Sequence, residues 1–403
     1  MIIGAGTHLR GVSTGIAQLQ AAGVNSIRDD AFVDVWRNSN PYAQSKNVVQ
    51  WALTQNSVCI LTAHLGQKPD TPEKIAEFCE FSKWMVLNVP TNIFEVMNEW
   101  WHPGTGAPSD AVSYMALQRA AYKAIKAVRP DCVVLGASGA PTGATGRAWL
   151  ADLQALGLDS ACDGVSIHPY NYSSPAPHAG NAMVDTRNLI ASMTKPIYIT
   201  EFGWPTYAGV GGQTEQFQAV QTISYLLRCL RDDRIKGAWI YDFHDDGADP
   251  ANREHNFGLV HNDYTPKPAF RALKTLIEAR KTGWVMVGLS IDSSLVTNWK
   301  AGASTLSPPV REALRDVLQA MRAGHAAIAK PATVNGQSRV FIRAPVPTDA
   351  LIPLLSERTT QITVTSIKTV GGKQLGDDVP IRLDAALEST HTTGVTLPGY
   401  AGW

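Results

Sequence analysis

Two glutamates at the ends of apolar runs are the residues of this sequence best suited to do chemistry. Glu99 ends the run FEVMNE, directly after Asn98, and Glu201 ends the run PIYITE about a hundred residues later. Two carboxyl groups can divide acid and base work between them if the fold brings them together over one bond. The pattern therefore raises the question of which elements position the pair.

Short β-rich runs alternate with segments of helical period along roughly the first 280 residues. This alternation is typical of repeated βα units around a parallel sheet. Eight units in a stretch of this length favour a closed (β/α)8 TIM barrel over an open doubly wound sheet. The strand candidates are IIGAGTH, NSIRDD, VCILTAH, NIFEVMNE, CVVLGAS, DGVSIHPY, PIYITEF and GAWIYDF.

The segments between these runs carry recognisable helix signals. Thr71 precedes Pro72, which predicts a capped helix start with proline in the first turn. The segment 213–230 places Phe217 and later apolar residues at helical spacing.

The active site of such a barrel lies at the C-terminal ends of its strands. Glu99 is predicted to end the fourth strand and Glu201 the seventh, so the two carboxylates lie nearly opposite each other across the barrel mouth. This arrangement suits the hydrolysis of a glycosidic bond, in which two carboxyl groups flank the bond that breaks. A lone glutamate more often caps a loop or pairs with an arginine, but two at matching strand ends favour a site.

The motifs MNE and TEFGWP, with HPY between them, resemble those of clan A of the retaining glycoside hydrolases. The closing FGLV and PKPAF resemble the end of many barrels of this clan. Within it, the chain is most similar to the branch with β-xylosidases, iduronidases and bacterial exopolysaccharide endoglycosidases. The resemblance covers roughly residues 1–280.

The resemblance implies that Glu99 is the general acid/base and that Glu201 is the nucleophile. It also implies that Asn98 binds the 2-hydroxyl of the sugar and that the carboxyl groups lie about 5–5.5 Å apart. Because the acid must keep its proton near neutral pH, we expect it to be the less solvated and less cation-paired of the two. Trp100 and Trp101 are candidates for an apolar wall beside Glu99.

Polar residues at the ends of other strands are expected to lie on the same rim, the edge of the barrel mouth formed by the C-terminal ends of the strands. Arg28, which ends the second strand, is expected to keep Glu201 ionised. The resemblance implies that Tyr170 donates a hydrogen bond to the nucleophile and that His168 lines the subsite where cleavage occurs. For His64, at the end of the third strand, a structural role and a functional one are equally well supported.

Aromatic residues near the rim are candidates for sugar platforms. Trp239 and Tyr241 share one side of the eighth strand by its period of two, and the clan commonly presents a tryptophan there. The sequence leaves open which of the two fills that place. Trp100, Trp101 and Trp204 offer faces for pyranose rings, with loop packing as the alternative.

Composition and spacing argue against metals and cofactors. The cluster of His244, Asp245, Asp246 and Asp249 is more typical of a turn with solvated carboxylates than of a metal site. No zinc spacing, Walker A loop or dinucleotide-binding motif is present, so we expect no cofactor. The cysteines form no CxxC pair and are predicted to be buried free thiols: Cys59, Cys79, Cys132, Cys162 and Cys229.

Charge and hydropathy limit the kinds of partner that the protein is expected to bind. Lys+Arg and Asp+Glu are equal at 35 each, so no basic excess favours nucleic acid. No apolar stretch approaches the length of a membrane span. The opening MIIGAGTHLRG lacks the features of a signal peptide, which leaves three locations open: cytoplasmic, virion-associated, or secreted with the signal trimmed. The oligomeric state is not readable.

The sequence predicts two domains, a catalytic barrel over 1–283 and an accessory domain over 284–403. The second is expected to be a small α+β or β-rich unit without chemistry of its own. It carries a helix pattern that begins at Ser307 and β-like runs at 339–344 and 361–367. The apolar face of that helix consists of Val310, Leu314, Val317, Leu318 and Met321.

The leading hypothesis is a retaining glycosidase that cleaves an oligo- or polysaccharide, with a bacterial surface or extracellular glycan as the favoured substrate. The tryptophans around the rim favour internal cleavage. A transglycosylase would use the same residues with a sugar as acceptor. A non-catalytic carbohydrate-binding barrel needs the aromatic residues but not the two glutamates. A virion-associated protein that degrades a surface glycan also remains open.

Overall fold

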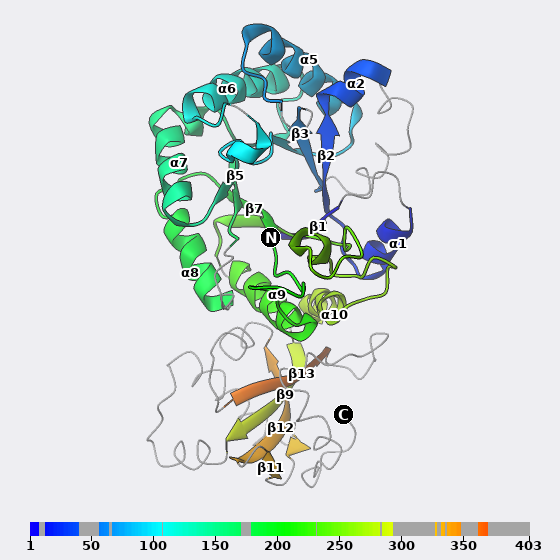
Figure 1. The fold of residues 1–403 in the computed structure, drawn as a ribbon. Helices are drawn as coiled ribbons and strands as arrows, with labels where there is room; N and C mark the ends of the chain where they lie inside the picture. The colour runs from blue at the N-terminus through cyan, green and yellow to red at the C-terminus, as the bar shows by residue number, and fades with distance from the viewer. Residues whose placement is uncertain are drawn as a thin grey trace.

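The described residues up to Thr282 form a closed barrel of eight parallel strands in sequence order, with helices around it (Figure 1). The computed structural model describes residues 1–7, 13–39, 56–63, 67–106, 108–170, 179–230, 232–282, 284–292, 327–328, 332–334, 337–347 and 362–369. The barrel closes because β8 pairs in parallel with β1. The (β/α)8 fold predicted from the sequence is confirmed.

Each predicted strand run overlaps one barrel strand. The strands are β1 (Ile2–Gly6), β2 (Ile27–Phe32), β3 (Val58–Thr62), β4 (Ile93–Val96), β5 (Val133–Pro141), β6 (Gly164–His168), β7 (Ile197–Phe202) and β8 (Ile235–Ile240). The main differences are that β4 ends before the predicted MNE and that β5 runs on to Pro141.

The helices lie outside the barrel and cover it. They are α1 (Ser13–Ala21), α2 (Val33–Ser39), α5 (Pro72–Asn88), α6 (Ala111–Val128), α7 (Gly143–Ala155), α8 (Ala179–Leu189), α9 (Glu215–Cys229) and α10 (Pro268–Thr282). Three short 3-10 helices are η1 (Pro103–Thr105), η2 (Leu158–Ser160) and η3 (Arg253–Asn256). The predicted cap is present, because Thr71 accepts a hydrogen bond from the N–H of Lys74 at the start of α5.

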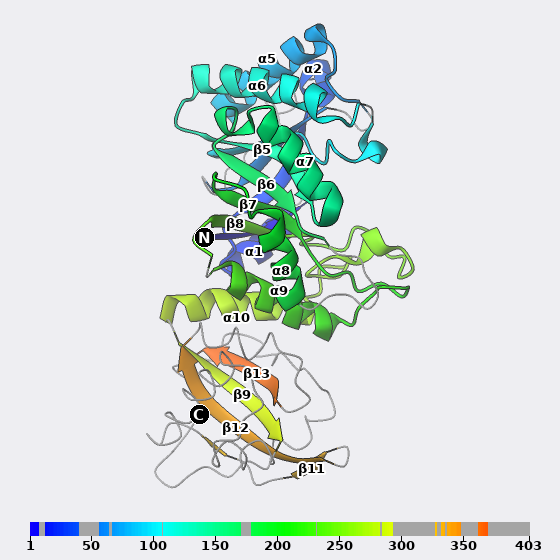
Figure 2. The same ribbon diagram turned by 90° about the vertical axis from the view of Figure 1, so that its left-hand side faces the viewer.

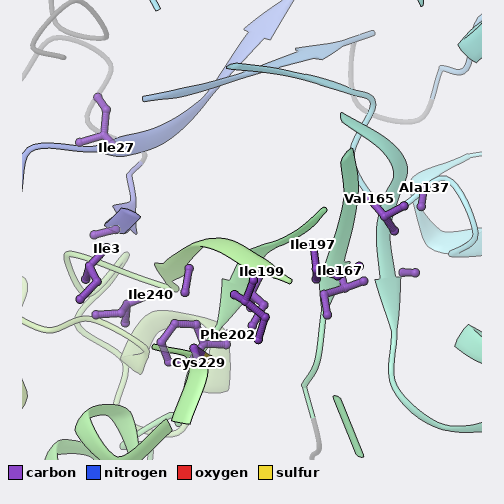
Figure 3. Close-up of a cluster of buried hydrophobic side chains, with 14 of the residues drawn as sticks. Ile3, Ile27, Ala137, Val165, Ile167, Ile197, Ile199, Phe202, Cys229 and Ile240 are labelled. Atoms are coloured by element: carbon purple, nitrogen blue, oxygen red, sulfur yellow. The ribbon is translucent and has the colours of Figure 1, made fainter. Parts of the chain in front are cut away.

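The barrel wall is buried on both faces. Toward the helices, β-branched side chains such as Val165, Ile167 and Ile199 pack in one large apolar cluster (Figure 3). A second, smaller cluster closes the end of the barrel at which most strands begin; it contains Val58, Ile93, Leu135, Tyr198 and Trp239. Because this floor is filled, the cavity described below lies at the opposite end of the barrel.

All five cysteines are free thiols, as predicted, and only Cys79 is not fully buried. No helix in the described part of the chain is long and apolar enough to cross a membrane.

A five-stranded antiparallel sheet follows the barrel. Its strands are β9 (Trp284–Asp292), β10 (Ala327–Ile328), β11 (Ala332–Val334), β12 (Gln337–Pro347) and β13 (Ile362–Thr369). The predicted β-like runs fall in β12 and β13, and the helix predicted after Ser307 lies outside the described residues. β9 and β13 lie against α10, below the barrel in Figure 2.

Candidate active site

The two glutamates reach the barrel mouth by different backbone routes. Glu201 lies within β7, whereas Glu99 comes three residues after the end of β4. Met97 and Glu99 both have positive φ, at 64° and 48°. Such conformations are costly for residues other than glycine and persist only where the surroundings hold them.

The neighbouring strands hold this turn in place. The N–H of Met97 donates to Leu61 O at 2.8 Å, and the N–H of Glu99 donates to Ser138 O at 2.9 Å. Ser138 also accepts from the N–H of Trp100 through its hydroxyl, at 3.0 Å. The backbone of β3 and β5 therefore determines where the carboxyl group of Glu99 points.

The two carboxylates meet at one histidine in a cavity of about 670 Å³. One oxygen of Glu99, one oxygen of Glu201 and one ring nitrogen of His168 all lie within 4.8 Å of one another. His168 Nδ1 is 3.0 Å from Glu99 Oε1 and 3.6 Å from Glu201 Oε2. Residues far apart in the sequence thus converge at the C-terminal end of the barrel.

Arg28 connects this pair to the barrel interior. Its Nη1 donates to Glu201 Oε1 at 2.6 Å, its Nη2 to Asn98 Oδ1 at 2.8 Å, and its Nε to Glu95 Oε2 at 2.8 Å. The guanidinium group is buried, and the carboxylates around it raise its pKa despite the burial. Arg28 therefore stays charged and holds one oxygen of Glu201.

The other oxygen of Glu201 accepts a hydrogen bond from the Tyr170 hydroxyl at 2.9 Å. Burial alone would raise the pKa of Glu201, but the charges of His168 and Arg28, together with this hydrogen bond, outweigh it and lower the pKa. For His168, burial acts to lower the pKa, but the carboxylates of Glu201 and Glu99 raise it above its usual value. Glu201 is thus held as a carboxylate.

Glu99 has different surroundings. Its side chain is 25% exposed, against 10% for Glu201, and among the described residues its carboxylate contacts His168 and no arginine or lysine. Glu99, the predicted acid, is the less cation-paired of the two glutamates, as expected. The expectation that it is also the less solvated one is wrong, because Glu201 lies deeper in the barrel.

Two predicted sugar platforms point away from the cavity. Trp100 is fully buried against Tyr114, with ring centroids 5.7 Å apart, and Trp204 packs against Phe202 and Tyr225. Neither lines the cavity, so the structure corrects both predictions. The left-handed backbone at Glu99 turns the next side chain into the core. Trp101 does line the cavity, and its Nε1 donates to Gly139 O at 2.9 Å.

On β8 the structure separates the two candidates that the sequence left open. Trp239 lies in the barrel floor, stacked on Tyr198, and its Nε1 donates to Ser26 Oγ at 2.8 Å. The prediction that it contacts substrate is wrong. Tyr241 lines the cavity, with its ring 6.2 Å from that of Tyr170. The Tyr241–Asp242 peptide bond is cis.

His64 lies outside the described residues. The sequence-based argument missed Glu95 and Thr200, which lie beneath the two catalytic candidates, as well as Asp29 and Asp30 in the cavity wall. A signal for Glu95 was present, because a charged residue inside the apolar strand β4 requires a buried partner.

The polar cluster after β8 has structural partners. Asp245 accepts from Lys267 Nζ at 2.7 Å and from the N–H of Gly258 at 2.8 Å, and His244 Nε2 contacts Asn262 O at 3.0 Å. These contacts tie the loop to the start of α10. In the described part of the chain, Glu99, His168 and Glu201 are the acidic and histidine side chains close enough to share an ion. Arg28 and Tyr170 already occupy both oxygens of Glu201.

Lys68 supports the segment that carries Glu99. It is buried, its Nζ donates to Trp100 O at 2.6 Å and to Ser109 Oγ at 3.2 Å, and it lies 5.2 Å from the Trp100 ring. We expect Lys68→Met to lower the free energy of unfolding by about 1.5–3 kcal/mol, because these are charged hydrogen bonds in a buried site. Equilibrium denaturant unfolding measures this. Lys83→Met, on the exposed face of α5, is the matched control; equal losses in the two variants would contradict the prediction.

Comparisons with known proteins show that the fold is shared with solved structures. No protein-family model matches the chain, and no curated protein matches it. Among solved structures, it is similar to a family 39 glycoside hydrolase from Bacteroides cellulosilyticus WH2, with 17% identity, a TM-score of 0.57, and 85% of this chain and 80% of that one covered.

Two further structures have the same barrel. One is a monomeric β-xylosidase from Caulobacter crescentus CB15, with 15% identity, a TM-score of 0.54, and 86% of this chain and 96% of that one covered. The other is a glucosidase from Croceicoccus marinus, with 14% identity, a TM-score of 0.53, and 68% and 67% covered. Similarity at this level of identity establishes a shared fold, and the chemistry must be argued from the cavity.

Proposed function

We propose that this protein is a retaining glycoside hydrolase of clan A that cleaves an oligo- or polysaccharide. The observation that carries the proposal is the approach of Glu99 and Glu201 to within 4.8 Å across the mouth of the barrel. Retaining enzymes hold their carboxyl groups about 5–5.5 Å apart, whereas inverting enzymes leave about 6.5–9.5 Å for a water molecule. The spacing favours direct attack by a carboxylate on the sugar.

The surroundings of the two glutamates support a division of roles. Arg28 and Tyr170 keep Glu201 ionised and oriented, which suits a nucleophile. Glu99 is more exposed, and among the described residues its carboxylate contacts only His168, which suits a group that exchanges protons with a leaving oxygen and with water.

The reaction would then proceed in two balanced steps. Glu201 attacks the anomeric carbon while the proton of Glu99 passes to the departing oxygen, which gives a covalent glycosyl-enzyme. Glu99 next takes a proton from a water molecule as that water attacks the same carbon and releases Glu201. No cofactor enters either step.

Asn98 has its amide oriented by the protein. Because Oδ1 accepts from Arg28 Nη2, the Nδ2 group is left to donate. Because Asn98 lines the cavity beside Glu201, this donor suits the 2-hydroxyl of the sugar, whose hydrogen bond strengthens in the transition state.

The solved structures with this fold include a glycoside hydrolase, a β-xylosidase and a glucosidase, which supports a carbohydrate substrate for this protein. Internal cleavage was predicted from tryptophans at the rim, and only Trp101 among them lines the cavity. The size of the products decides between internal and terminal cleavage. We further propose that residues 284–403 form an accessory domain.

The test is hydrolysis of a panel of neutral and acidic polysaccharides and aryl glycosides by the purified full chain. Proton NMR during the first minutes shows the anomeric form of the product, and size analysis separates internal from terminal cleavage. Product that first appears with the configuration of the substrate supports the proposal. Inverted product would overturn the retaining mechanism, and binding without cleavage would favour a carbohydrate-binding barrel.

Tyr170→Phe tests the state of the nucleophile. Glu201 must be ionised, and its lowered pKa means that activity is lost only as the pH falls through that low value. Loss of the Tyr170 hydroxyl raises the pKa, so the acidic limb of the kcat/KM profile should move up by about one pH unit. Tyr122→Phe, which removes a hydroxyl bonded to Asp163 at 3.1 Å far from the cavity, is the control. An unmoved limb would separate Tyr170 from the ionisation of Glu201.

A further inference from the structure

A buried carboxylate lies directly beneath the catalytic pair. Glu95, on β4, is fully buried and its two oxygens have different partners. Oε2 accepts from Arg28 Nε at 2.8 Å, and Oε1 accepts from Thr200 Oγ1 at 3.0 Å. Because a buried carboxylate is costly without such donors, both bonds are required by its position.

The hydrogen bond from Thr200 to Glu95 determines the direction of the hydrogen bond between Thr200 and His168. Thr200 Oγ1 also lies 3.1 Å from His168 Nε2. A hydroxyl has a single proton, and here Glu95 Oε1 takes it. Thr200 can therefore only accept from His168, and Nε2 must carry a hydrogen.

The contact between Arg28 and His168 does not reverse this assignment. Arg28 Nη2 is 3.4 Å from His168 Nε2, at the outer limit of a hydrogen bond, while it donates to Asn98 Oδ1 at 2.8 Å. Nη2 has two hydrogens, one of which goes to Asn98, and its other contact, with Nε2, is longer than the 3.1 Å between Nε2 and Thr200 Oγ1. The shorter contact therefore determines the partner of Nε2.

The opposite nitrogen of the ring faces the acid. With the Nε2 hydrogen committed to Thr200, Nδ1 lies 3.0 Å from Glu99 Oε1, which is close enough for the two atoms to share a proton. The ring cannot easily shift, because a Cβ at Gly139 would lie 2.5 Å from its atoms, so Gly139 packs closely against it.

We propose that Glu95 and Thr200 are positioning residues that keep His168 in its Nε2–H form, so that Nδ1 and Glu99 share a single proton. The kinetic consequence rests on the proposed function. When Glu99 gives its proton to the leaving oxygen, His168 is left neutral with Nε2–H, and the water that attacks next restores the proton to Glu99. The proton count closes without another reactant.

The charged groups around His168 agree with this role. The ring faces Glu99, Glu201 and Arg28, and Tyr170 packs against it with ring centroids 6.3 Å apart. Burial lowers the pKa of His168, and the two catalytic carboxylates raise it by more. The shared proton is therefore retained over a wider pH range than a free imidazole would allow.

The direct test is nitrogen NMR of the full chain labelled with [¹⁵N]histidine, with the His168 signals identified by their loss in His168→Gln. We expect Nε2 to carry a hydrogen in the wild type at every pH, including where the ring is neutral. Thr200→Val keeps the β-branched shape but removes the acceptor, and should populate the Nδ1–H form. A neutral wild-type ring protonated at Nδ1 would overturn the proposal, whether or not any variant folds.

The kinetic test uses the same variants. Without an acceptor for Nε2–H, the imidazolium is less stable, so Thr200→Val should move the basic limb of the kcat profile down by about one pH unit and lower kcat about tenfold. Thr200→Ser, which restores the hydroxyl, should return the limb toward the wild-type position. A limb in Thr200→Val that coincides with the wild type would contradict the proposal.

A buried threonine far from the cavity supplies the control. Thr186 bonds Ala182 O at 2.8 Å and the Tyr225 hydroxyl at 2.7 Å, so Thr186→Val removes a buried hydroxyl without touching His168. It should lose stability and leave the limb in place. If the wild type hydrolyses no glycoside, the proposed function fails, while the NMR result still decides the form of His168.

Discussion

Glu201→Gln is expected to lower kcat for glycoside hydrolysis on the order of 10⁴-fold or more, with every substrate that the wild type cleaves. Glutamine keeps the shape of the side chain but offers no carboxylate to attack the anomeric carbon. Because the covalent intermediate cannot form, a good leaving group should not rescue the variant. Steady-state kinetics with an aryl glycoside at the wild-type optimum measures the loss.

Glu99→Gln tests the proposed role of Glu99 as the acid separately from that of Glu201 as the nucleophile. It should cost about 10²–10⁴-fold with a poor leaving group, which needs protonation, and much less in the first step with an activated aryl group. A burst of aryl alcohol followed by slow turnover would show the trapped glycosyl-enzyme. Glu80→Gln, on the exposed face of α5, controls for the substitution itself. Equal sensitivity to the leaving group in both variants would contradict the assigned roles.

Arg28→Met is expected to lower the free energy of unfolding by about 3–5 kcal/mol near neutral pH. The substitution leaves Glu95 and Glu201 buried without their cation, and an uncompensated buried charge is far more costly than a lost surface pair. Arg37→Met is the matched control, because Arg37 is 48% exposed in its pair with Glu77 and such pairs contribute about 0–1 kcal/mol. Denaturant unfolding of the two variants gives the difference.

The pH dependence of this loss has a definite sign. Since the folded-state pKa of Glu201 is lowered, its ion pair stabilises the wild type above the ordinary glutamate pKa of about 4.3 and is lost as the pH falls through the folded value. The gap between wild type and Arg28→Met should therefore shrink on acidification. The double variant Arg28→Met/Glu95→Leu should recover part of the lost free energy of unfolding, because it also removes the buried carboxylate of Glu95 that Arg28→Met leaves without a cation. A gap that widens at low pH would contradict the ion-pair account.

Local patterns were sufficient for the barrel. Alternation between β-rich runs and helical segments predicted all eight strands in order, because parallel strands buried on both faces are apolar and short. The helix start at Thr71 was equally local, since a cap needs only its own side chain and the next turn. The bounds failed where the backbone departs from a regular strand, as at Met97, where a residue other than glycine takes a left-handed conformation.

The sequence predicted where in the fold the site residues lie, but it predicted the directions of their side chains less well. Strand order places Glu99, Glu201, Arg28 and His168 at one end of the barrel, and the structure brings them together there. The directions of Trp100 and Trp204 were wrong, because irregular turns after β4 and β7 decide whether a ring faces the cavity or the core.

By itself, the sequence determined the barrel and the two strands, β4 and β7, whose C-terminal ends bring the carboxylates to the barrel mouth. It could do so because strand order follows chain order in this fold. Only the tertiary structure decided that Trp239 fills the floor while Tyr241 reaches the cavity. Two residues on one side of a strand lie about 6.6–6.8 Å apart along it, which is enough to separate floor from mouth. It also decided the partners of Glu95, which come from β2 and β7 and meet only when the barrel closes.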